Sequence, residues 1–244
     1  MAVAKHGNRA MSGVCGSADV LEALGVNLDL TPTQIADCID TVGIGFLFAQ
    51  KHHPAMKQVA VPRREIGFRT LFNLLGPLSN PAGATYQVMG VYAPHLLDIA
   101  IGTLRALDCE RAMVLHGAGG MVEISTHGET LYRELLRGEI HTGVLTPESF
   151  GLTGTPPLAE HLAPAATPAE NATLLRNVLS GAKETPAEIA QRDLVAVNAA
   201  AALRVRGLVQ EWQEGYQVAL EVIDSGRALT RLERLIQHSQ AFAE

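Results

Sequence analysis

Three segments of the chain share a helix-start signal that precedes apolar residues. A Thr-Pro-x-Gln or Thr-Pro-x-Glu pattern begins at Thr31, Thr167 and Thr185. The threonine suits the N-cap, the proline suits the first helical position, and Gln or Glu completes a capping box. After the first signal, apolar residues recur at helical spacing at Ile35, Cys38, Ile39 and Val42. The pattern predicts three helices.

Short apolar segments in the middle of the chain alternate with a helical pattern. Residues 86–91 and 112–115 resemble strands, residues 96–107 between them resemble a helix, and residues 131–136 add a further strand. Strand, helix and strand in this order predict a parallel unit, whose ligands collect at the C-terminal ends of the strands. We therefore expect an α/β fold, with a parallel-containing central sheet, flanking helices and a helical segment near the front of the chain.

The remaining segments are predicted to be a loop and a helical stretch. Residues 151–166 are rich in proline, glycine and threonine, which predicts a long surface loop. Residues 188–243 are helical in pattern, with Gly207 and Gly226 as breaks.

Composition narrows the class of protein. The 244 residues are 47% hydrophobic and 18% charged, which excludes a disordered chain. A net charge of −6 argues against nucleic acid as a partner, because phosphate neutralisation needs clustered cations. The three cysteines fit neither a disulfide framework nor a zinc site. No signal peptide or membrane span is evident, so we expect a cytoplasmic protein that has no membrane partner.

The densest polar cluster runs from Lys5 to Asp19. Its glycines let backbone N–H groups approach a ligand, and Lys5 and Arg9 add positive charge. Ser17 can cap a following helix, from Ala18 to about Leu24, whose N-terminus favours an anion. A phosphate cradle and a solvated basic loop explain these residues about equally well.

The other polar motifs are less specific. Zinc is rejected at His52 and His53, because adjacent histidines are poor co-ligands on a helix. A histidine and Arg63 facing a cleft suit an aromatic carboxylate, although surface charge explains Arg63 alone. Residues 73–81 predict a tight connection, and Glu123 is the only carboxylate in the loop 116–125, which is weak evidence for Mg²⁺. Serine hydrolases and P-loop enzymes are excluded, because their motifs are absent.

Five motifs in order carry a resemblance that extends from residue 2 to the C-terminus. They are Lys5-His6-Gly7-Asn8-Arg9, the run that begins Gly16-Ser17-Ala18-Asp19, His53-Pro54-Ala55-Met56, Arg63-Arg64-Glu65-Ile66-Gly67, and the stretch from Phe72 to Ala82. Together they resemble the anthranilate phosphoribosyltransferases of tryptophan synthesis. The resemblance implies the fold of the nucleoside phosphorylase/phosphoribosyltransferase-like family.

The resemblance implies transfer of phosphoribose from phosphoribosyl pyrophosphate (PRPP) to the amine of anthranilate, with Mg²⁺ and release of pyrophosphate. Catalysis then needs no protein nucleophile, only positioning and charge stabilisation. The implied PRPP site comprises Lys5, His6, Gly7, Asn8, Arg9, Ser12, Gly13 and Ser17. The implied anthranilate site comprises Asn8, His53, Arg63, Gly76 and Pro77, with Arg63 on the carboxylate. Glu123 matches the second acid of the family's Asp-Glu metal pair.

The chain departs from the family pattern in two places. The family's N-terminal helices and its Gly-Thr-Gly-Gly-Asp pyrophosphate loop precede the first residue here, and Val122 occupies the position of the family's metal-binding Asp. The family is homodimeric through helices that are largely absent here. We accordingly expect a PRPP-loop remnant over 1–16, the remainder of a helical subdomain over 17–60 and an α/β domain over 61–244. We expect little turnover from this chain alone.

Three interpretations follow from these departures. The chain is a piece of a working transferase, a degenerate relative that binds ligand or acts as a partner subunit, or a nucleic-acid-binding relative of the same fold. The acidity and the lack of a basic stripe argue against the third.

Overall fold

The computed structural model describes residues 1–10, 15–54 and 72–243. The chain forms two compact units. The first unit comprises Met1–Gly83, Pro164–Arg176 and Leu229–Glu244, and the second comprises Ala84–Ala163 and Asn177–Ala228.

The first unit is built on a pair of parallel strands, β1 (Val3–Gly7) and β2 (Ile44–Phe48). Helices α1 (Ser17–Ala23) and α2 (Pro32–Val42) connect them, and α3 (Ala49–His52) follows β2 directly. Helices α5 (Phe72–Leu78), α8 (Pro168–Leu179) and α11 (Arg227–Gln240) come from later in the chain. Because the strands are parallel, both end at the same edge, where Gly7 pairs with Phe48.

The core of this unit joins α2, β2 and α11. The predicted apolar face of α2 is buried, with Cys38 fully inaccessible, and it packs with Phe46 of β2 and Leu235 of α11. Polar contacts add to this packing, because the Asn27 N–H donates to Ser239 Oγ at 3.1 Å.

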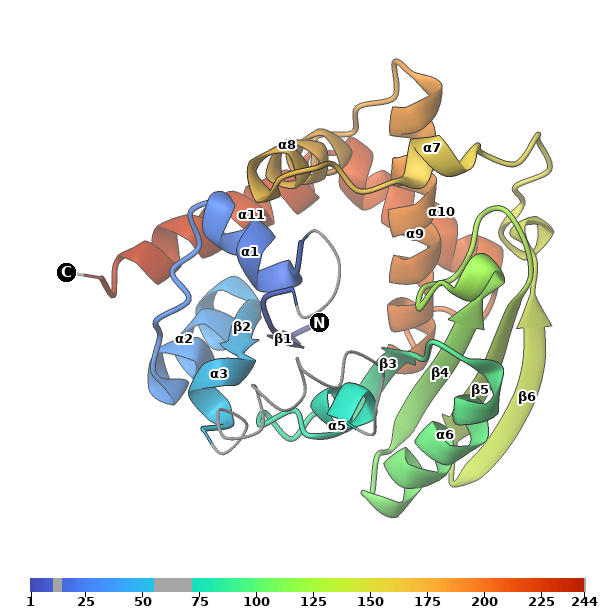
Figure 1. Cartoon of the computed structure of the whole chain (residues 1–244), viewed down its shortest axis with the longest axis horizontal. Coiled ribbons are helices and arrows are strands. Elements are labelled where there is room, and N and C mark those ends of the chain that lie inside the picture. The colour runs from blue at the N-terminus through green and yellow to red at the C-terminus, as the bar shows by residue number, and fades with distance from the viewer. Residues whose placement is uncertain (11–14, 55–71, 244) are drawn as a thin grey trace. The chain divides into compact units, whose positions relative to one another are not determined.

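The second unit is a four-stranded mixed sheet (Figure 1). Its strands, in the order β3-β4-β5-β6, are β3 (Tyr86–Gly90), β4 (Arg111–Gly117), β5 (Thr130–Leu136) and β6 (Glu139–Leu145). Strands β3 and β4 are parallel, whereas β5 and β6 are antiparallel to their neighbours. Short turns η1 (Pro94–Leu96), η2 (Ala118–Gly120) and η3 (Pro147–Phe150) lie between the main elements. The predicted α/β class and parallel strand–helix–strand unit are confirmed.

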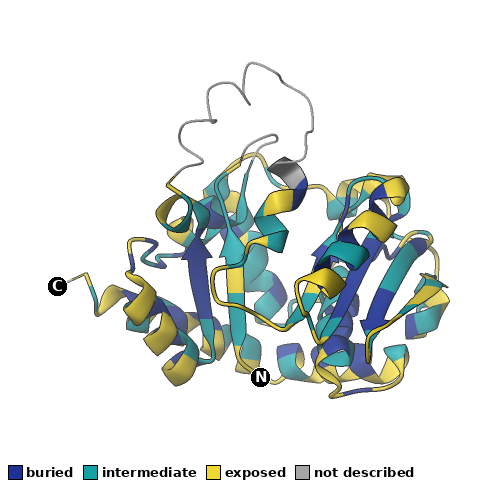
Figure 2. Ribbon diagram, turned by 90° about the horizontal axis from the view of Figure 1, so that it is seen from below, coloured by how far each residue is buried: buried dark blue, intermediate teal, exposed yellow. Residues whose placement is uncertain are grey.

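Strand β4 is covered on both faces, as the dark-blue strands of the sheet indicate (Figure 2). Met113 and Leu115 pack in a core cluster with Ala196 and Ala200 of α9 (Pro186–Arg206). The alternate residues Ala112 and Val114 are equally buried and point to the opposite face, where α6 (Leu97–Ala106) contacts β4. Helix α10 (Trp212–Asp224) packs against α9.

The three predicted helix starts are confirmed at α2, α8 and α9. In each, the threonine Oγ1 accepts from the backbone N–H three residues later, at 3.2 to 3.4 Å, and the Gln or Glu side chain returns to the threonine N–H. The predicted break at Gly207 is also confirmed, because that residue ends α9 with φ of 77°.

Other details differ from the sequence-based expectation. The pattern did not predict β1, β2 or β6, and the expected loop over 151–166 contains the short helix α7 (Ala159–Leu162). Ser17 does not cap α1. The N-cap is Gly16, and its N–H donates to the carboxylate of Asp19 instead. Nowhere in 1–10, 15–54 and 72–243 does a helix have both the length and the apolar character needed to cross a membrane.

Candidate functional site

In the first unit, two of the motifs meet at the C-terminal edge of β1 and β2. His6 and Gly7 end β1, and α3 carries His52 to its end with His53 directly after it. The parallel register pairs His6 with Leu47, only a few residues before the histidine pair. The fold therefore brings His6 of the first motif and His53 of the third motif together at the strand edge where α/β folds bind ligands.

His6 is held by two contacts that fix its tautomer. Its Nδ1 lies 3.0 Å from the carbonyl oxygen of Gly76 on α5, and a carbonyl only accepts, so Nδ1 carries the proton. Its Nε2 lies 3.2 Å from Nε2 of His53, which then donates to it. Burial lowers the pKa of His6, although the bond to Gly76 opposes this effect. A neutral His6 thus contacts both Gly76 and His53, so that three residues of the predicted site are joined.

The side chain of Asn8 is oriented by its own segment and by α3. Asn8 Oδ1 accepts from the Arg9 N–H at 2.8 Å and from Gln50 Nε2 at 3.3 Å. With the oxygen used twice, the amide NH₂ of Asn8 remains as the donor that this side chain can offer to a ligand.

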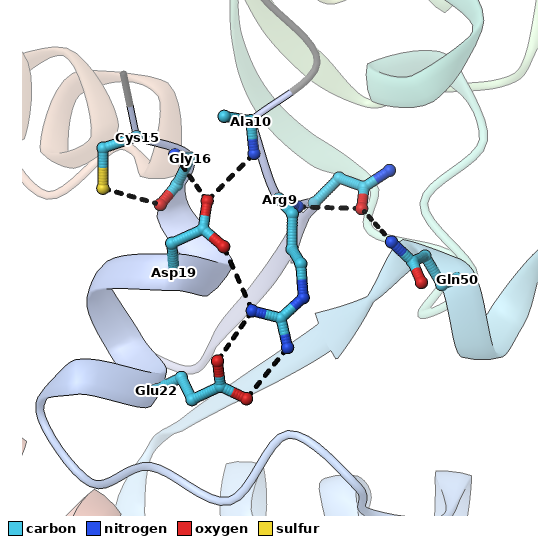
Figure 3. A network of polar contacts seen from close by, with 8 residues as sticks. Arg9, Ala10, Cys15, Gly16, Asp19, Glu22 and Gln50 are labelled. Atoms are coloured by element: carbon cyan, nitrogen blue, oxygen red, sulfur yellow. Dashed lines mark hydrogen bonds and ion pairs between the residues drawn. The ribbon is translucent and has the colours of Figure 1, made fainter. Parts of the chain in front are cut away.

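Arg9 faces two carboxylates of helix α1 (Figure 3). Its Nη1 donates to Asp19 Oδ1 at 3.1 Å and to Glu22 Oε2 at 2.7 Å, and its Nη2 donates to Glu22 Oε1 at 2.9 Å. The guanidinium also lies 5.5 Å from the ring centroid of Phe48. The hydrogen bonds to Glu22 and Asp19 raise the pKa of Arg9, and the pKa values of both carboxyls are lowered.

Glycine allows the strand end and the helix start to pack closely. A Cβ on Gly16 would meet the backbone of Asn8, Arg9 and Ala10, and a Cβ on Gly7 would meet Ser17 Oγ and the ring of Phe46. The predicted PRPP residues Gly7 and Ser17 are therefore in contact.

Two further predicted residues, Lys5 and Pro77, lie within the described part of this unit. Lys5 is exposed on β1 and donates to the His6 carbonyl at 3.2 Å, and Pro77 lies inside α5 beside Gly76. Ser12, Gly13 and Arg63 lie outside the described residues.

In the second unit, the loop after β4 carries Glu123. Its backbone crosses the ends of two strands, because a Cβ on Gly90 of β3 would overlap the carbonyl oxygen of Val122, and one on Gly117 of β4 would overlap that of Glu123. Gly119 and Gly120 take φ values of 69° and 84°, which a residue with a side chain rarely adopts.

Hydrogen bonds fix the same loop from the other side. Asn198 of α9 accepts from the Ile124 N–H at 2.8 Å and donates to the Ile124 carbonyl at 3.1 Å. The Ser125 N–H donates to Thr130 Oγ1 at 2.9 Å. Glu123 thus sits on a backbone that is held on both sides.

The donor set of this loop limits the metal that it could hold. Glu123 is exposed and offers carboxylate oxygens, whereas Val122, 43% exposed, offers none. Within the described parts of the chain, no three His, Cys, Asp or Glu side chains group as metal ligands. One carboxylate fits a Mg²⁺ ion whose other ligands are phosphate oxygens and water, and does not fit a site made wholly by protein.

Three residues that contact the predicted site residues or their loop are not predicted by the sequence patterns. Asp19 contacts the predicted residue Arg9, and Gln50 contacts the predicted residue Asn8. Asn198 holds the loop of Glu123 and lies 75 residues after it. Asp19 was detectable as the third residue after the N-cap, where an acid closes a capping box. No local sequence pattern identifies Gln50 or Asn198 as a contact of the site.

Comparison with known proteins identifies the family of the chain. Residues 1–229 match the model of the "Glycosyl transferase family, a/b domain". Anthranilate phosphoribosyltransferase from Thermomicrobium roseum is 50% identical over 99% of this chain and 68% of its own. The crystal structure of the Thermus thermophilus enzyme superposes with a TM-score of 0.87 at 43% identity, covering 98% of this chain and 69% of that one.

A third relative was solved with ligands. Anthranilate phosphoribosyltransferase from Saccharomyces cerevisiae, in complex with PRPP and Mg, has a TM-score of 0.87 at 28% identity, covering 99% of this chain and 66% of that one. The chain thus spans about two thirds of the length of these relatives. A family model that matches nearly the whole chain, together with relatives of this identity, shows that the chain belongs to the anthranilate phosphoribosyltransferase family.

Proposed function

We propose that this chain takes part in the transfer of phosphoribose from PRPP to the amine of anthranilate, with release of pyrophosphate. The observation that carries the proposal is the convergence of His6, Asn8 and His53 at one strand edge, where His6 contacts His53 and Gly76, and Asn8 contacts Gln50 of α3. The proposal agrees with the family of the chain.

In this proposal the chain contributes positioning. Gly7, Asn8 and Ser17 face PRPP with backbone and side-chain donors, while Lys5 supplies positive charge near the leaving group. His53 and Gly76 line the anthranilate side. Because His53 Nε2–H donates to His6, the Nδ1 of a neutral His53 is an acceptor suited to the N–H of an aromatic amine. Arg63 remains a sequence-level assignment to the anthranilate carboxylate.

Glu123 is the residue that we assign to Mg²⁺. When bound, the ion neutralises charge on the departing pyrophosphate. The chain's part is to hold the Glu123 carboxylate on a loop fixed by Gly117 and Asn198, so that the ion needs only phosphate and water besides.

A second candidate function is binding without turnover. Val122 favours it, because this side chain cannot ligate the ion at the position where the family has Asp. Such a chain would bind PRPP or anthranilate without transferring phosphoribose.

The test follows anthranilate fluorescence with the purified chain, PRPP and Mg²⁺, leaving out each component in turn. A decrease that needs both PRPP and Mg²⁺ supports transfer. Calorimetric binding of PRPP without any decrease supports the second candidate, and absence of both binding and turnover contradicts both.

A pair of asparagine variants tests the assignment of Asn8 to the PRPP site. We expect Asn8→Ala to weaken PRPP binding or catalytic efficiency by about tenfold, because it removes an oriented donor. Asn177→Ala on α8 is the matched control, since no partner is seen for that side chain in the described structure. Equal effects of the two variants would overturn the assignment of Asn8.

A further inference from the structure

The polar network of Arg9 is unusual for a residue that is expected to contact a phosphate. Both protons of Nη1 are taken, one by Asp19 and one by Glu22, and Nη2 bonds the second oxygen of Glu22. Figure 3 shows the guanidinium pointing at the helix, between these two carboxylates. Two negative charges therefore surround one positive charge, so the cluster has no net attraction for a polyanion.

Asp19 does more than pair with Arg9. Its Oδ2 accepts from the Ala10 N–H at 3.0 Å and from the Gly16 N–H at 2.9 Å, while Oδ1 accepts from Arg9. One carboxylate thereby joins the end of the segment after β1 to the start of α1. The side chain of Asp19 is only 18% exposed, which reduces solvent screening of these bonds.

The backbone around this clamp is the part of the chain that carries the predicted PRPP residues. The Ala18 N–H donates to the Asn8 carbonyl at 3.2 Å, and Gly16 leaves no room for a side chain against Asn8 to Ala10. Gly7, Asn8 and Ser17 therefore depend for their positions on the strand–helix junction that Asp19 closes.

We infer that Arg9 and Asp19 are positioning residues of the PRPP site, not ligands of PRPP. Asp19 fixes the backbone at Ala10 and Gly16, and Arg9 fixes Asp19 and Glu22 on α1. The inference rests on the proposed function, because it names residues that act on the donor site through Gly7, Asn8 and Ser17. The lowered pKa of Asp19 agrees with it, since three donors stabilise the carboxylate.

The first experiment is a double-mutant cycle of Arg9→Gln and Asp19→Asn, read by calorimetry of PRPP binding with Mg²⁺ and by anthranilate binding. If Arg9 acts through Asp19, each variant weakens PRPP binding by about tenfold and the double variant is little worse than either. The anthranilate affinity of each variant stays within about twofold of the parent value, whereas general unfolding would weaken the binding of both ligands. If Arg9 binds pyrophosphate directly, the two effects multiply, and the inference is wrong.

Arg9→Lys separates charge from geometry. Lysine keeps the positive charge but cannot bond Glu22 through two parallel N–H groups while bonding Asp19. We expect Arg9→Lys to resemble Arg9→Gln. PRPP affinity retained within about twofold would mean that the charge itself matters, and would overturn the inference.

A second readout is independent of ligand binding. We expect the amide hydrogens of Ala10 and Gly16 to exchange at least about tenfold faster in Asp19→Asn, measured by NMR with thermal unfolding as a check on folding. Asp40→Asn on α2 is the matched control, because Asp40 is exposed and no partner is seen for it in the described structure. Unchanged exchange contradicts the clamp. Absence of PRPP binding in the parent chain contradicts the proposed function instead.

Discussion

The junction between β1 and α1 and the loop after β4 are held in different ways. At the junction, hydrogen bonds of the charged side chains of Asp19 and Arg9 join the end of the β1 segment to the start of α1. At the loop, Gly90 of β3 and Gly117 of β4 let the loop backbone lie against the strand ends, and Asn198 adds neutral hydrogen bonds.

The difference separates two kinds of sensitivity. A network of ionised groups depends on pH, on salt and on each partner, whereas a steric fit depends on volume alone. We therefore expect the loop to respond most strongly to a single added methyl group and the junction to respond to charge.

The largest expected effect is that of Gly90→Ala. Its Cβ would overlap the Val122 carbonyl oxygen, so the loop or the strand must move. We expect a loss of about 3 kcal/mol in the free energy of unfolding, or roughly 6–12 °C in Tm. Urea and thermal unfolding measure it.

Gly102→Ala on α6 is the matched control for this change. No atom lies within 4 Å of a Cβ built on Gly102, and alanine is the better helix former. We expect this variant to gain about 0.5–1 kcal/mol. A Gly90→Ala variant as stable as the parent would contradict the steric account of the loop.

Val122→Asp tests the metal assignment of the same loop. Val122 is 43% exposed, so the added carboxylate stays in water and stability is unchanged. A second carboxylate beside Glu123 is expected to lower the Mg²⁺ concentration for half-maximal PRPP binding by about three- to tenfold. The matched control is Val144→Asp, at a valine that is 50% exposed on β6. The same Mg²⁺ dependence in both variants would argue against Glu123 as a ligand.

The smallest expected effect is the pH dependence of the junction region. The pKa of His6 is lowered, chiefly by burial, and His53, His52 and Lys5 near it act in the same direction. The unfolded chain therefore binds a proton at His6 more readily than the folded chain does. The stability from neutral His6 is present above pH 6.5 and is lost as the pH falls through the lowered folded value.

Asp19 and Glu22 titrate in a separate and lower range. Hydrogen bonds lower the pKa of both from their ordinary values of 3.8 and 4.5, so their contribution is lost only in stronger acid. Urea unfolding between pH 7.5 and pH 3 is expected to show both losses. His6→Gln removes only the first, and a His6→Gln profile identical to that of the parent would contradict this account.

The three helix starts and the strand–helix–strand unit could be predicted because their signals are local. The capping threonines and the alternation of strand and helix from 86 to 115 each lie within a few residues. Strand β1 could not be predicted, because it is short, carries Lys5 and His6, and pairs with a strand about 40 residues later. Tertiary pairing makes it a strand, where the pattern indicates a loop.

For the site, the motifs identified the segments but not the contacts within them. The first motif identifies Arg9 as a site residue. It does not predict that the Arg9 side chain points toward α1, because this depends on the position of Glu22 on that helix. Asn198 reaches Ile124 from 74 residues away, and no pattern in either segment encodes that distance.

The first unit is assembled from segments that lie far apart in the sequence, and this has a consequence for synthesis on the ribosome. Ser239 bonds the Asn27 N–H, and the Gln240 side chain bonds the Gly25 carbonyl, across separations of 212 and 215 residues. The second unit has emerged almost entirely before helix α11 does. The apolar core around Phe46 therefore stays incomplete, and exposed to aggregation or to a chaperone, until helix α11 has been translated.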